Sequence, residues 1–301
     1  MAKAFILGGS GFLGKKLTKE LVRSPYDITA LVHSNRNIGL HNSIKTINGS
    51  LETFDWKRLE SDPPDIIFHA ARMSGSNRKS RQLAAAKNAR ANSRLLAWLR
   101  NLDNPPLLVF VSGTLVYGTH DDQPVDEAQH PSPISFQREY FYAEQPVLHL
   151  QKNNQLPIII VRPSWIYDHG SWFRAFYEKY MQKKAAVPIY GKGSNLMAFV
   201  HVRDAAAMTS HVAQFGEHGE IYNLYTEPAI RQREFAEMLA AQSRLPLRHV
   251  PHWWLKIRFD KAVSEAFSFS LNLRTHHQKI WKNYKFYYPK LNEWIENEFP
   301  I

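Results

Sequence analysis

Short apolar runs alternate with longer amphipathic stretches along the first two thirds of the chain. The runs are rich in Ile, Leu, Val and Phe, as expected of strands that are buried on both faces of a sheet. The predicted strands are Ala4–Leu7, Ile28–Val32, Lys45–Ile47, Asp65–Ala70, Leu107–Val111, Pro157–Val161, Ala198–Val202 and Ile221–Leu224. The predicted helices are Leu13–Arg23, Lys79–Leu99, Phe136–Gln151 and Asp204–Phe215. Strands that alternate with helices predict a parallel sheet with helical crossovers, which is an α/β fold.

Two regions depart from this alternation. Pro146 stands inside the third predicted helix, and because proline lacks an N–H donor we expect a kink or a break there. The residues from 227 onward lack the strand–helix rhythm and carry many aromatic residues. They predict a smaller, mostly helical lobe that packs on the first part of the chain.

The three motif glycines Gly8, Gly11 and Gly14 stand at the junction of the first strand and the first helix, in the sequence Gly8-Gly9-Ser10-Gly11-Phe12-Leu13-Gly14. One glycine permits a tight turn, one lets the backbone approach a pyrophosphate, and one lets the helix pack closely on the sheet. The helix N-terminus then offers free amides and a partial positive charge to phosphate groups. A strand, a turn and a helix in this order are the context that the motif requires. The turn therefore predicts a Rossmann-type, doubly wound domain that binds a dinucleotide.

The end of the second predicted strand distinguishes NAD from NADP. An NAD site places a carboxylate about 20 residues after the glycines, where it binds the ribose 2′-hydroxyl. Here the strand ends in His33, Ser34, Asn35 and Arg36, without an acidic residue. A guanidinium can pair with a 2′-phosphate through two hydrogen bonds, and a hydroxyl and an imidazole add further donors. We therefore expect NADP as the cofactor, with NAD as the alternative.

Composition narrows the class of protein further. The chain has no cysteine, which excludes disulfides, thiolate metal sites and a cysteine nucleophile. The histidine spacings lack an acidic residue at a ligand-like distance, so we expect no metal site.

The chain enters its first strand at once and lacks an apolar run of about 18 residues, which predicts a cytoplasmic protein without a membrane partner. The net charge is +11, and the Lys and Arg residues that produce it are scattered along the chain. We interpret the basic and aromatic stretch at 279–288 as packed rings beneath lysines rather than as a nucleic-acid binding site.

A series of motifs resembles the short-chain dehydrogenase/reductase superfamily, in its extended or atypical branch of NAD-dependent epimerase/dehydratase-like proteins. Besides the glycine turn, they are Asp65–Ala71, Asn88–Leu96, Val109–Gly118, Val161–Tyr167, Phe199–Ala206 and Tyr222–Leu224. The resemblance covers most of the chain. It implies a cofactor-binding domain of residues 1–164 and 196–226 and a substrate lobe of residues 165–195 and 227–301, joined in one compact unit.

The resemblance also implies the cofactor contacts and the partners. The expected cofactor-binding residues are Gly8, Ser10, Gly11, Phe12, Leu13, Gly14, His33, Ser34, Arg36, Ser50, Leu51, Ala70, Ala71, Val111, Ser112 and Pro163. The expected substrate is a small molecule with a carbonyl or hydroxyl group, nucleotide sugars being one class. A homodimer is left open. Segments that approach the substrate in this family contain Arg72, Arg78, Arg81, Trp165, Trp172, Phe173 and Arg174.

The catalytic pair of the family is altered in this chain. Redox members use Tyr-x-x-x-Lys, in which the Tyr exchanges a proton with the substrate and the ammonium lowers the pKa of the phenol. Their helix continues to a glutamate, whose place Glu144 takes here. In that register Phe136 stands at the Tyr position and Tyr140 at the Lys position. If Tyr140 is taken as the acid instead, Glu144 falls at the Lys position, so the usual pair is absent in either register.

The hydroxyl that usually fixes the substrate oxygen is displaced as well. Its position is Gly113, with Ser112 and Thr114 on either side. Three explanations remain open. The chain could be an oxidoreductase or epimerase that uses Tyr140 or Tyr142 with Thr114. It could take the proton from water or His130, or it could be a non-catalytic NADP-binding regulatory or structural protein.

Overall fold

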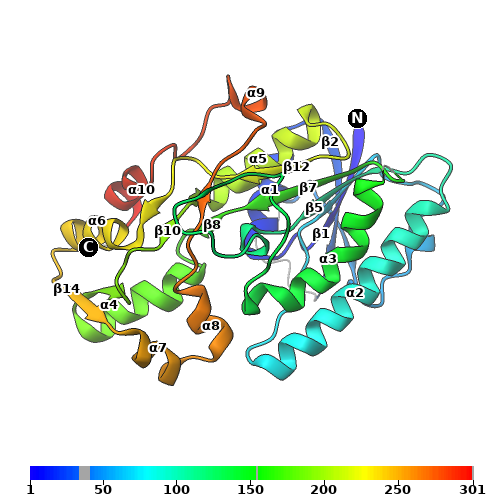
Figure 1. Cartoon of the computed structure of the whole chain (residues 1–301). Helices are drawn as coiled ribbons and strands as arrows, with labels where there is room; N and C mark the ends of the chain where they lie inside the picture. Colours follow the sequence, from blue (N-terminus) through cyan, green and yellow to red (C-terminus); the bar gives the residue numbers. More distant parts are fainter. Residues whose placement is uncertain (34–40, 154, 300–301) are drawn as a thin grey trace. The chain divides into compact units, whose positions relative to one another are not determined.

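The computed structural model describes residues 1–33, 41–153 and 155–299. Figure 1 shows the chain coloured from its N-terminus to its C-terminus. The chain divides into two compact units, each made of three stretches. Unit 1 consists of Met1–Ser112, Glu139–Arg162 and Ala206–Tyr222. Unit 2 consists of Gly113–Arg138, Pro163–Ala205 and Asn223–Ile301. No helix in the described part of the chain is both long and apolar enough to cross a membrane.

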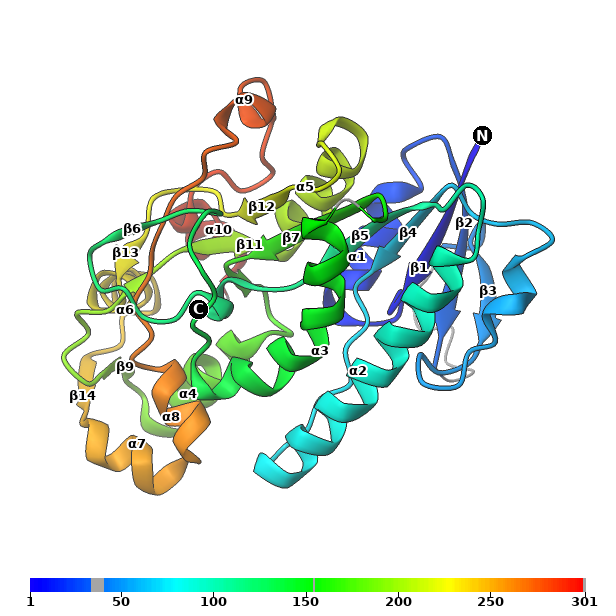
Figure 2. The same ribbon diagram turned by 45° about the vertical axis from the view of Figure 1, so that its right-hand side comes forward.

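A seven-stranded sheet with the order β12-β7-β5-β4-β1-β2-β3 forms the framework (Figure 2). Its strands are β1 (Ala2–Leu7), β2 (Tyr26–Val32), β3 (Lys45–Asn48), β4 (Ile66–His69), β5 (Leu107–Val111), β7 (Ile158–Pro163) and β12 (Ile221–Leu224). The neighbouring pairs from β7 to β3 are parallel. All residues of β4 and β7 are buried, which explains the apolar runs that precede His69 in β4 and Arg162 in β7. The predicted Rossmann-type fold is confirmed, and the strand order reverses between β1 and β4.

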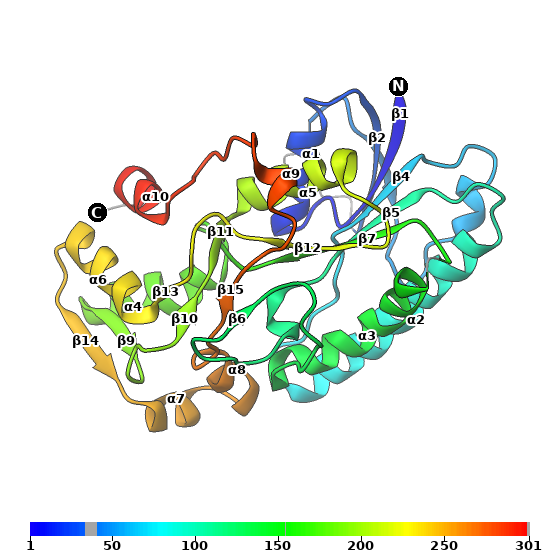
Figure 3. The same ribbon diagram turned by 45° about the horizontal axis from the view of Figure 1, so that its top comes forward.

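Helices cover both faces of this sheet (Figure 3). They are α1 (Phe12–Leu21), α2 (Arg78–Arg100), α3 (Ser135–Lys152) and α5 (Val202–Phe215), with a short 3-10 turn η1 (Trp56–Leu59) before β4. Helices α2 and α3 run side by side, and the Asn92 amide of α2 donates to the Ala143 carbonyl of α3 at 2.8 Å. Asn77 caps α2, because its side chain accepts a hydrogen bond from the Ser80 N–H while the Ser80 hydroxyl oxygen accepts one from the Asn77 N–H.

Helix α3 continues through Pro146, so that of the two expected outcomes, a kink or a break, the break is absent. A proline at this position leaves the carbonyl of Tyr142, one turn earlier, without its helical donor. The side chain of Tyr142 is 65% exposed, so water can reach this turn of the helix and supply the missing hydrogen bond.

Unit 2 combines helices with short strands around an aromatic core. Its helices are α4 (Lys179–Lys184), α6 (Gln232–Ser243), α7 (His252–Arg258), α8 (Lys261–Ala266), α9 (Gln278–Trp281) and α10 (Leu291–Glu298), with a 3-10 turn η2 (Thr114–Val116) and a π-helical turn η3 (Arg174–Glu178). Its strands are β6 (Pro124–Val125), β8 (Trp165–Tyr167), β9 (Val187–Tyr190), β10 (Leu196–Met197), β11 (Phe199–His201), β13 (Ile230–Arg231), β14 (Leu247–Val250) and β15 (Asn272–Leu273). The predicted strand Ala198–Val202 therefore corresponds to β11 alone. The core rings include Tyr167, Phe173, Tyr177, Phe235 and Trp294.

Candidate functional site

The glycine turn of unit 1 has a geometry that only glycine allows. Gly8 has a φ of +83°, and a Cβ atom there would lie 2.7 Å from the Cα of Ala71. A Cβ on Gly14 would lie 1.9 Å from the carbonyl oxygen of Gly8. The N–H of Gly11 donates to the same carbonyl at 2.8 Å, which closes the turn. The backbone of the turn, the end of β4 and the start of α1 therefore lie in direct contact.

The N-terminus of α1 is open to an anion. Its N-cap is Gly11, which has no side chain to cap the first amides, and the first turn contains no acidic residue. The first amides of a helix have no acceptor within the helix, so these amides and the positive end of the helix dipole suit a phosphate group. Phe12 at the start of the helix is 37% exposed, Leu13 is buried, and Ser10 is half-buried in the turn.

The expected residues beyond the turn lie at different places in the fold. His33 is exposed at the end of β2, whereas Ser34 and Arg36 lie outside the described residues. The hydroxyl of Ser50 is hydrogen-bonded to that of Thr53 at 2.8 Å. Leu51 is buried in the hydrophobic core of unit 1.

Four of the expected cofactor residues follow neighbouring strands. Ala70 and Ala71 come directly after β4, and Val111 and Ser112 lie at the end of β5, all of them half-buried. Because β1, β4 and β5 are parallel neighbours, these residues and the glycine turn share the carboxyl edge of the sheet. Ligands of doubly wound sheets bind at this edge, where the strand order reverses. Pro163, the remaining expected contact, is buried at the end of β7 and belongs to unit 2.

A buried charged cluster lies behind this edge. The Ser112 hydroxyl donates to the Glu144 carboxylate at 2.5 Å, and the Arg162 guanidinium donates to its other oxygen at 3.3 Å. Arg162 and Glu144 are 1% and 3% exposed. Burial raises the pKa of the Glu144 carboxyl above its usual value, while the Arg162 charge and the two hydrogen bonds act in the opposite direction. The hydroxyl of Ser112, a residue expected to contact the cofactor, is therefore hydrogen-bonded within this cluster.

Tyr140 is the buried phenol of this region. The Gly75 N–H donates to its hydroxyl oxygen at 3.4 Å, and the Arg72 guanidinium lies 4.4 Å from the centre of its ring. Arg72 itself is exposed. The structure thus joins Tyr140 to Arg72, which the sequence analysis named separately, and to Gly75, which it missed because the contact spans 65 residues.

Tyr142, the alternative acid, belongs to unit 1 with Tyr140, whereas Thr114 and Phe136 belong to unit 2. Thr114 is buried at the start of η2, and Phe136 is half-buried in the first turn of α3.

A second arginine near the substrate segments is already paired, since the buried Arg81 lies 3.5 Å from the Glu139 carboxylate. Arg81 is therefore neutralised by a protein carboxylate, whereas Arg72 faces an uncharged ring.

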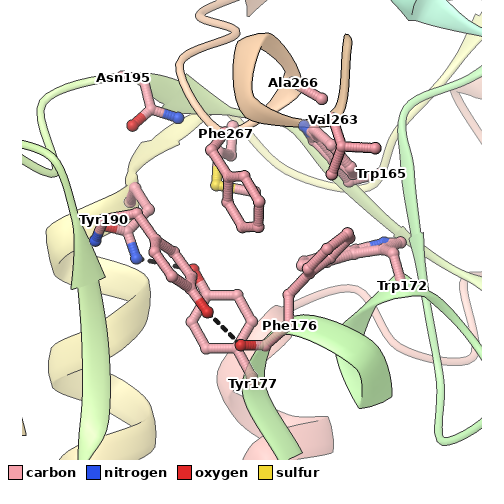
Figure 4. Close-up of a pocket in the computed structure, with 11 residues that line it drawn as sticks. Trp165, Trp172, Phe176, Tyr177, Tyr190, Asn195, Val263, Ala266 and Phe267 are labelled. Carbon is pink, nitrogen blue, oxygen red and sulfur yellow. Dashed lines mark hydrogen bonds between the residues drawn. The ribbon is translucent and has the colours of Figure 1, made fainter. Parts of the chain in front are cut away.

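Unit 2 contains a small aromatic pocket of its own, with a cavity volume of about 30 Å³. It is lined by Trp165, Trp172, Phe176, Tyr177, Tyr190, Asn195, Met197, Gln232, Val263, Ala266 and Phe267. Figure 4 shows the Phe267 ring pointing into the space between Tyr190 and Phe176. The Tyr190 hydroxyl donates to the Phe176 carbonyl. Trp165 and Trp172, expected near the substrate, line this pocket, whereas Phe173 is fully buried in the core.

Comparison with known proteins gives a consistent picture. A model of the NAD dependent epimerase/dehydratase family matches residues 4–224. An uncharacterised protein of Saccharomyces cerevisiae is 24% identical over 258 residues, which cover 83% of each chain. The dTDP-glucose 4,6-dehydratase of Bacillus anthracis, solved with NAD, gives a TM-score of 0.78 at 18% identity and covers 98% of this chain and 94% of that one. A human epimerase family protein solved with NADPH gives a TM-score of 0.75 at 15% identity and covers 98% of both chains. At these identities the solved structures show the fold alone.

Proposed function

The chain belongs to the NAD-dependent epimerase/dehydratase family, and on that premise we propose that it is an NADP(H)-dependent oxidoreductase in which Tyr140 exchanges a proton with a carbonyl or hydroxyl substrate. The observation that carries the proposal is the position of the Arg72 guanidinium over the Tyr140 ring, with the Gly75 N–H on the phenol oxygen. The family assignment agrees with the resemblance seen in the sequence motifs.

The residues of unit 1 fit a dinucleotide. The absence of a Cβ atom at Gly8 and Gly14 lets the turn pack directly against the backbone after β4 and at the start of α1, and the amides at the start of α1 would hold the pyrophosphate. His33, Ser34 and Arg36, which follow β2 in the sequence, would bind a 2′-phosphate. When bound, the nicotinamide supplies or accepts a hydride.

Tyr140 would take the role that Phe136 cannot fill, since a phenyl ring has no proton to exchange. During reduction, the Tyr140 hydroxyl donates its proton to the substrate oxygen as that oxygen gains negative charge. The phenolate left behind is stabilised by the Arg72 charge and by the hydrogen bond from the Gly75 N–H. Arg72 thus supplies the positive charge that a lysine supplies in related enzymes, and a proton from solvent restores the phenol.

We expect NADPH to bind at least about tenfold more tightly than NADH, because charge-assisted hydrogen bonds to a 2′-phosphate contribute roughly this much affinity. Titration of both nucleotides by fluorescence or calorimetry measures the ratio. Arg36→Ala should lower the affinity for NADPH about tenfold and leave the affinity for NADH unchanged. Tighter binding of NADH would refute the role of His33, Ser34 and Arg36, and binding of neither nucleotide would refute the cofactor assignment.

Tyr140→Phe should lower kcat at least about 100-fold on any aldehyde or ketone that the protein reduces, because general-acid catalysis contributes this much or more. The Kd for NADPH should stay within about twofold of the wild type, since the phenol would act on the substrate. Tyr142→Phe is the matched control, because Tyr142 lies on the same helix and is 65% exposed. Loss of activity in Tyr142→Phe alone would reassign the acid. NADPH binding without turnover of any carbonyl in a broad panel would favour the non-catalytic alternative instead.

A further inference from the structure

The stretch from Arg244 to Lys261 in unit 2 exposes apolar side chains to solvent. It contains β14 and α7, which follow one another along one edge of this unit in all three views (Figures 1–3). Trp253 is 62% exposed, Ile257 is 77% exposed and Leu247 is 41% exposed. Trp253 and Ile257 lie one turn apart on α7, opposite the fully buried Leu255. The outward face of this helix is therefore apolar where a solvated helix would be polar.

The same stretch carries a concentrated positive charge. Its exposed basic residues are Arg244, Arg248, Lys256, Arg258 and Lys261. Asp260 is the single acidic residue between positions 244 and 261, and its carboxylate accepts a hydrogen bond from the Val263 N–H as the cap of α8. The negative charge of Asp260 is thus placed at the start of a helix, and the stretch from 244 to 261 as a whole is basic.

Contrary to the expectation that the protein has no membrane partner, we propose that this basic apolar surface, comprising Leu247, Trp253 and Ile257 with their five basic neighbours, attaches the protein reversibly to an anionic lipid surface. A Trp and an aliphatic side chain on one helix face enter the boundary between headgroups and acyl chains. Lys and Arg reach from the edges of such a helix to the headgroups, and each contributes attraction to anionic lipid. Three exposed apolar residues are few, so attachment requires the negative charge of the lipid and is reversible.

The charge of this surface favours an anionic lipid over two other binding partners, a second copy of the chain and a nucleic acid. A second copy of the chain would bring five like charges against five, which opposes self-association. A nucleic acid would be attracted by the charge but would leave Ile257 and Leu247 without a role, because phosphate contacts come from polar donors. An anionic lipid surface uses both the charge and the apolar residues. This inference does not depend on the proposed function, and its test uses no cofactor or substrate.

The test is flotation of the full chain with vesicles of phosphatidylcholine alone and of phosphatidylcholine with phosphatidylserine at a ratio of three to one. We expect binding to the anionic vesicles only, weakening as salt rises. Trp253→Ser with Ile257→Ser should lower the partition coefficient at least about tenfold, and Lys256→Glu should lower it at least about fivefold. The control pair is Phe215→Ser, which removes a 65% exposed ring from unit 1, and Lys152→Glu, at an exposed position at the end of α3.

Three results would overturn the proposal. Equal binding to neutral vesicles would remove the electrostatic part. An equal loss in the unit 1 controls would show that net charge or exposed apolar area, rather than this surface, governs binding. Binding of a DNA duplex that displaces the vesicles and survives Trp253→Ser with Ile257→Ser would identify a polyanion site instead. Because the replaced side chains are exposed, circular dichroism should show unchanged folding in each variant.

Discussion

Replacing Gly14 with alanine is expected to lower the affinity for NADPH at least about 100-fold, since a Cβ atom there would lie 1.9 Å from the carbonyl oxygen of Gly8 and 2.8 Å from its carbonyl carbon. Both neighbours are backbone atoms, so a rotamer change cannot relieve the overlap. The start of α1 must move away from the turn, and the amides that would bind the pyrophosphate move with it. Titration of NADPH against the variant measures the loss.

Gly113→Ala is the matched control for this prediction. A Cβ atom at Gly113 would lie 3.8 Å from its nearest neighbour, the carbonyl oxygen of Pro163, which is an ordinary contact. We expect NADPH affinity within about twofold of the wild type there. If Gly14→Ala bound NADPH as well as Gly113→Ala does, the glycine turn could not be the place where the pyrophosphate binds.

Arg162→Met is expected to lower the free energy of unfolding by about 3–5 kcal/mol at pH 7, because it leaves the buried Glu144 carboxylate without its positive partner. The loss should also depend on pH. Burial raises the pKa of Glu144, and removal of the Arg162 charge raises it further. Because the pKa of Glu144 is higher in the folded than in the unfolded state, binding of a proton to Glu144 stabilises the folded protein. This stabilisation reaches its full size below the ordinary pKa of 4.5. That contribution is lost as the pH rises through the folded-state pKa.

The defect of Arg162→Met should therefore shrink as the pH falls from 7 toward 4.5, when urea unfolding is followed at several pH values. The double variant Arg162→Met with Glu144→Gln removes both charges and should recover most of the lost stability, since Gln can still accept the hydrogen bond from Ser112. A defect that stays constant with pH, or that is equally large in the double variant, would contradict an uncompensated Glu144 charge as its cause.

The sheet and the glycine turn could be predicted because their signals are local. Strand β5 was predicted at its observed residues, and β4 and β7 within two residues at each end, because burial on both faces makes most of each strand apolar. The strands β6, β10, β13 and β15 contain two residues each, which is too short for any periodicity to appear. Tertiary pairing, rather than local sequence, determines these strands.

Only part of the candidate catalytic site could be predicted from the sequence. The altered Tyr-x-x-x-Lys pair can be seen in the sequence at Phe136 and Tyr140, but the Arg72 and Gly75 contacts of Tyr140 join α3 to the loop after β4. No spacing rule connects such distant positions. For the same reason, Glu144 could be placed by its spacing on the helix, whereas its pairing with Arg162 required the structure.

The division of the chain into interleaved stretches has a consequence for biosynthesis. The chain passes between the two units five times, and the strand β12 at the edge of the large sheet is not complete until Leu224. During synthesis on the ribosome, the cofactor-binding sheet therefore lacks its last strand, and β7 remains an open edge, until about three quarters of the protein has been made. A fragment that ends before this point would expose that edge, so neither unit can be isolated by a single cut in the chain.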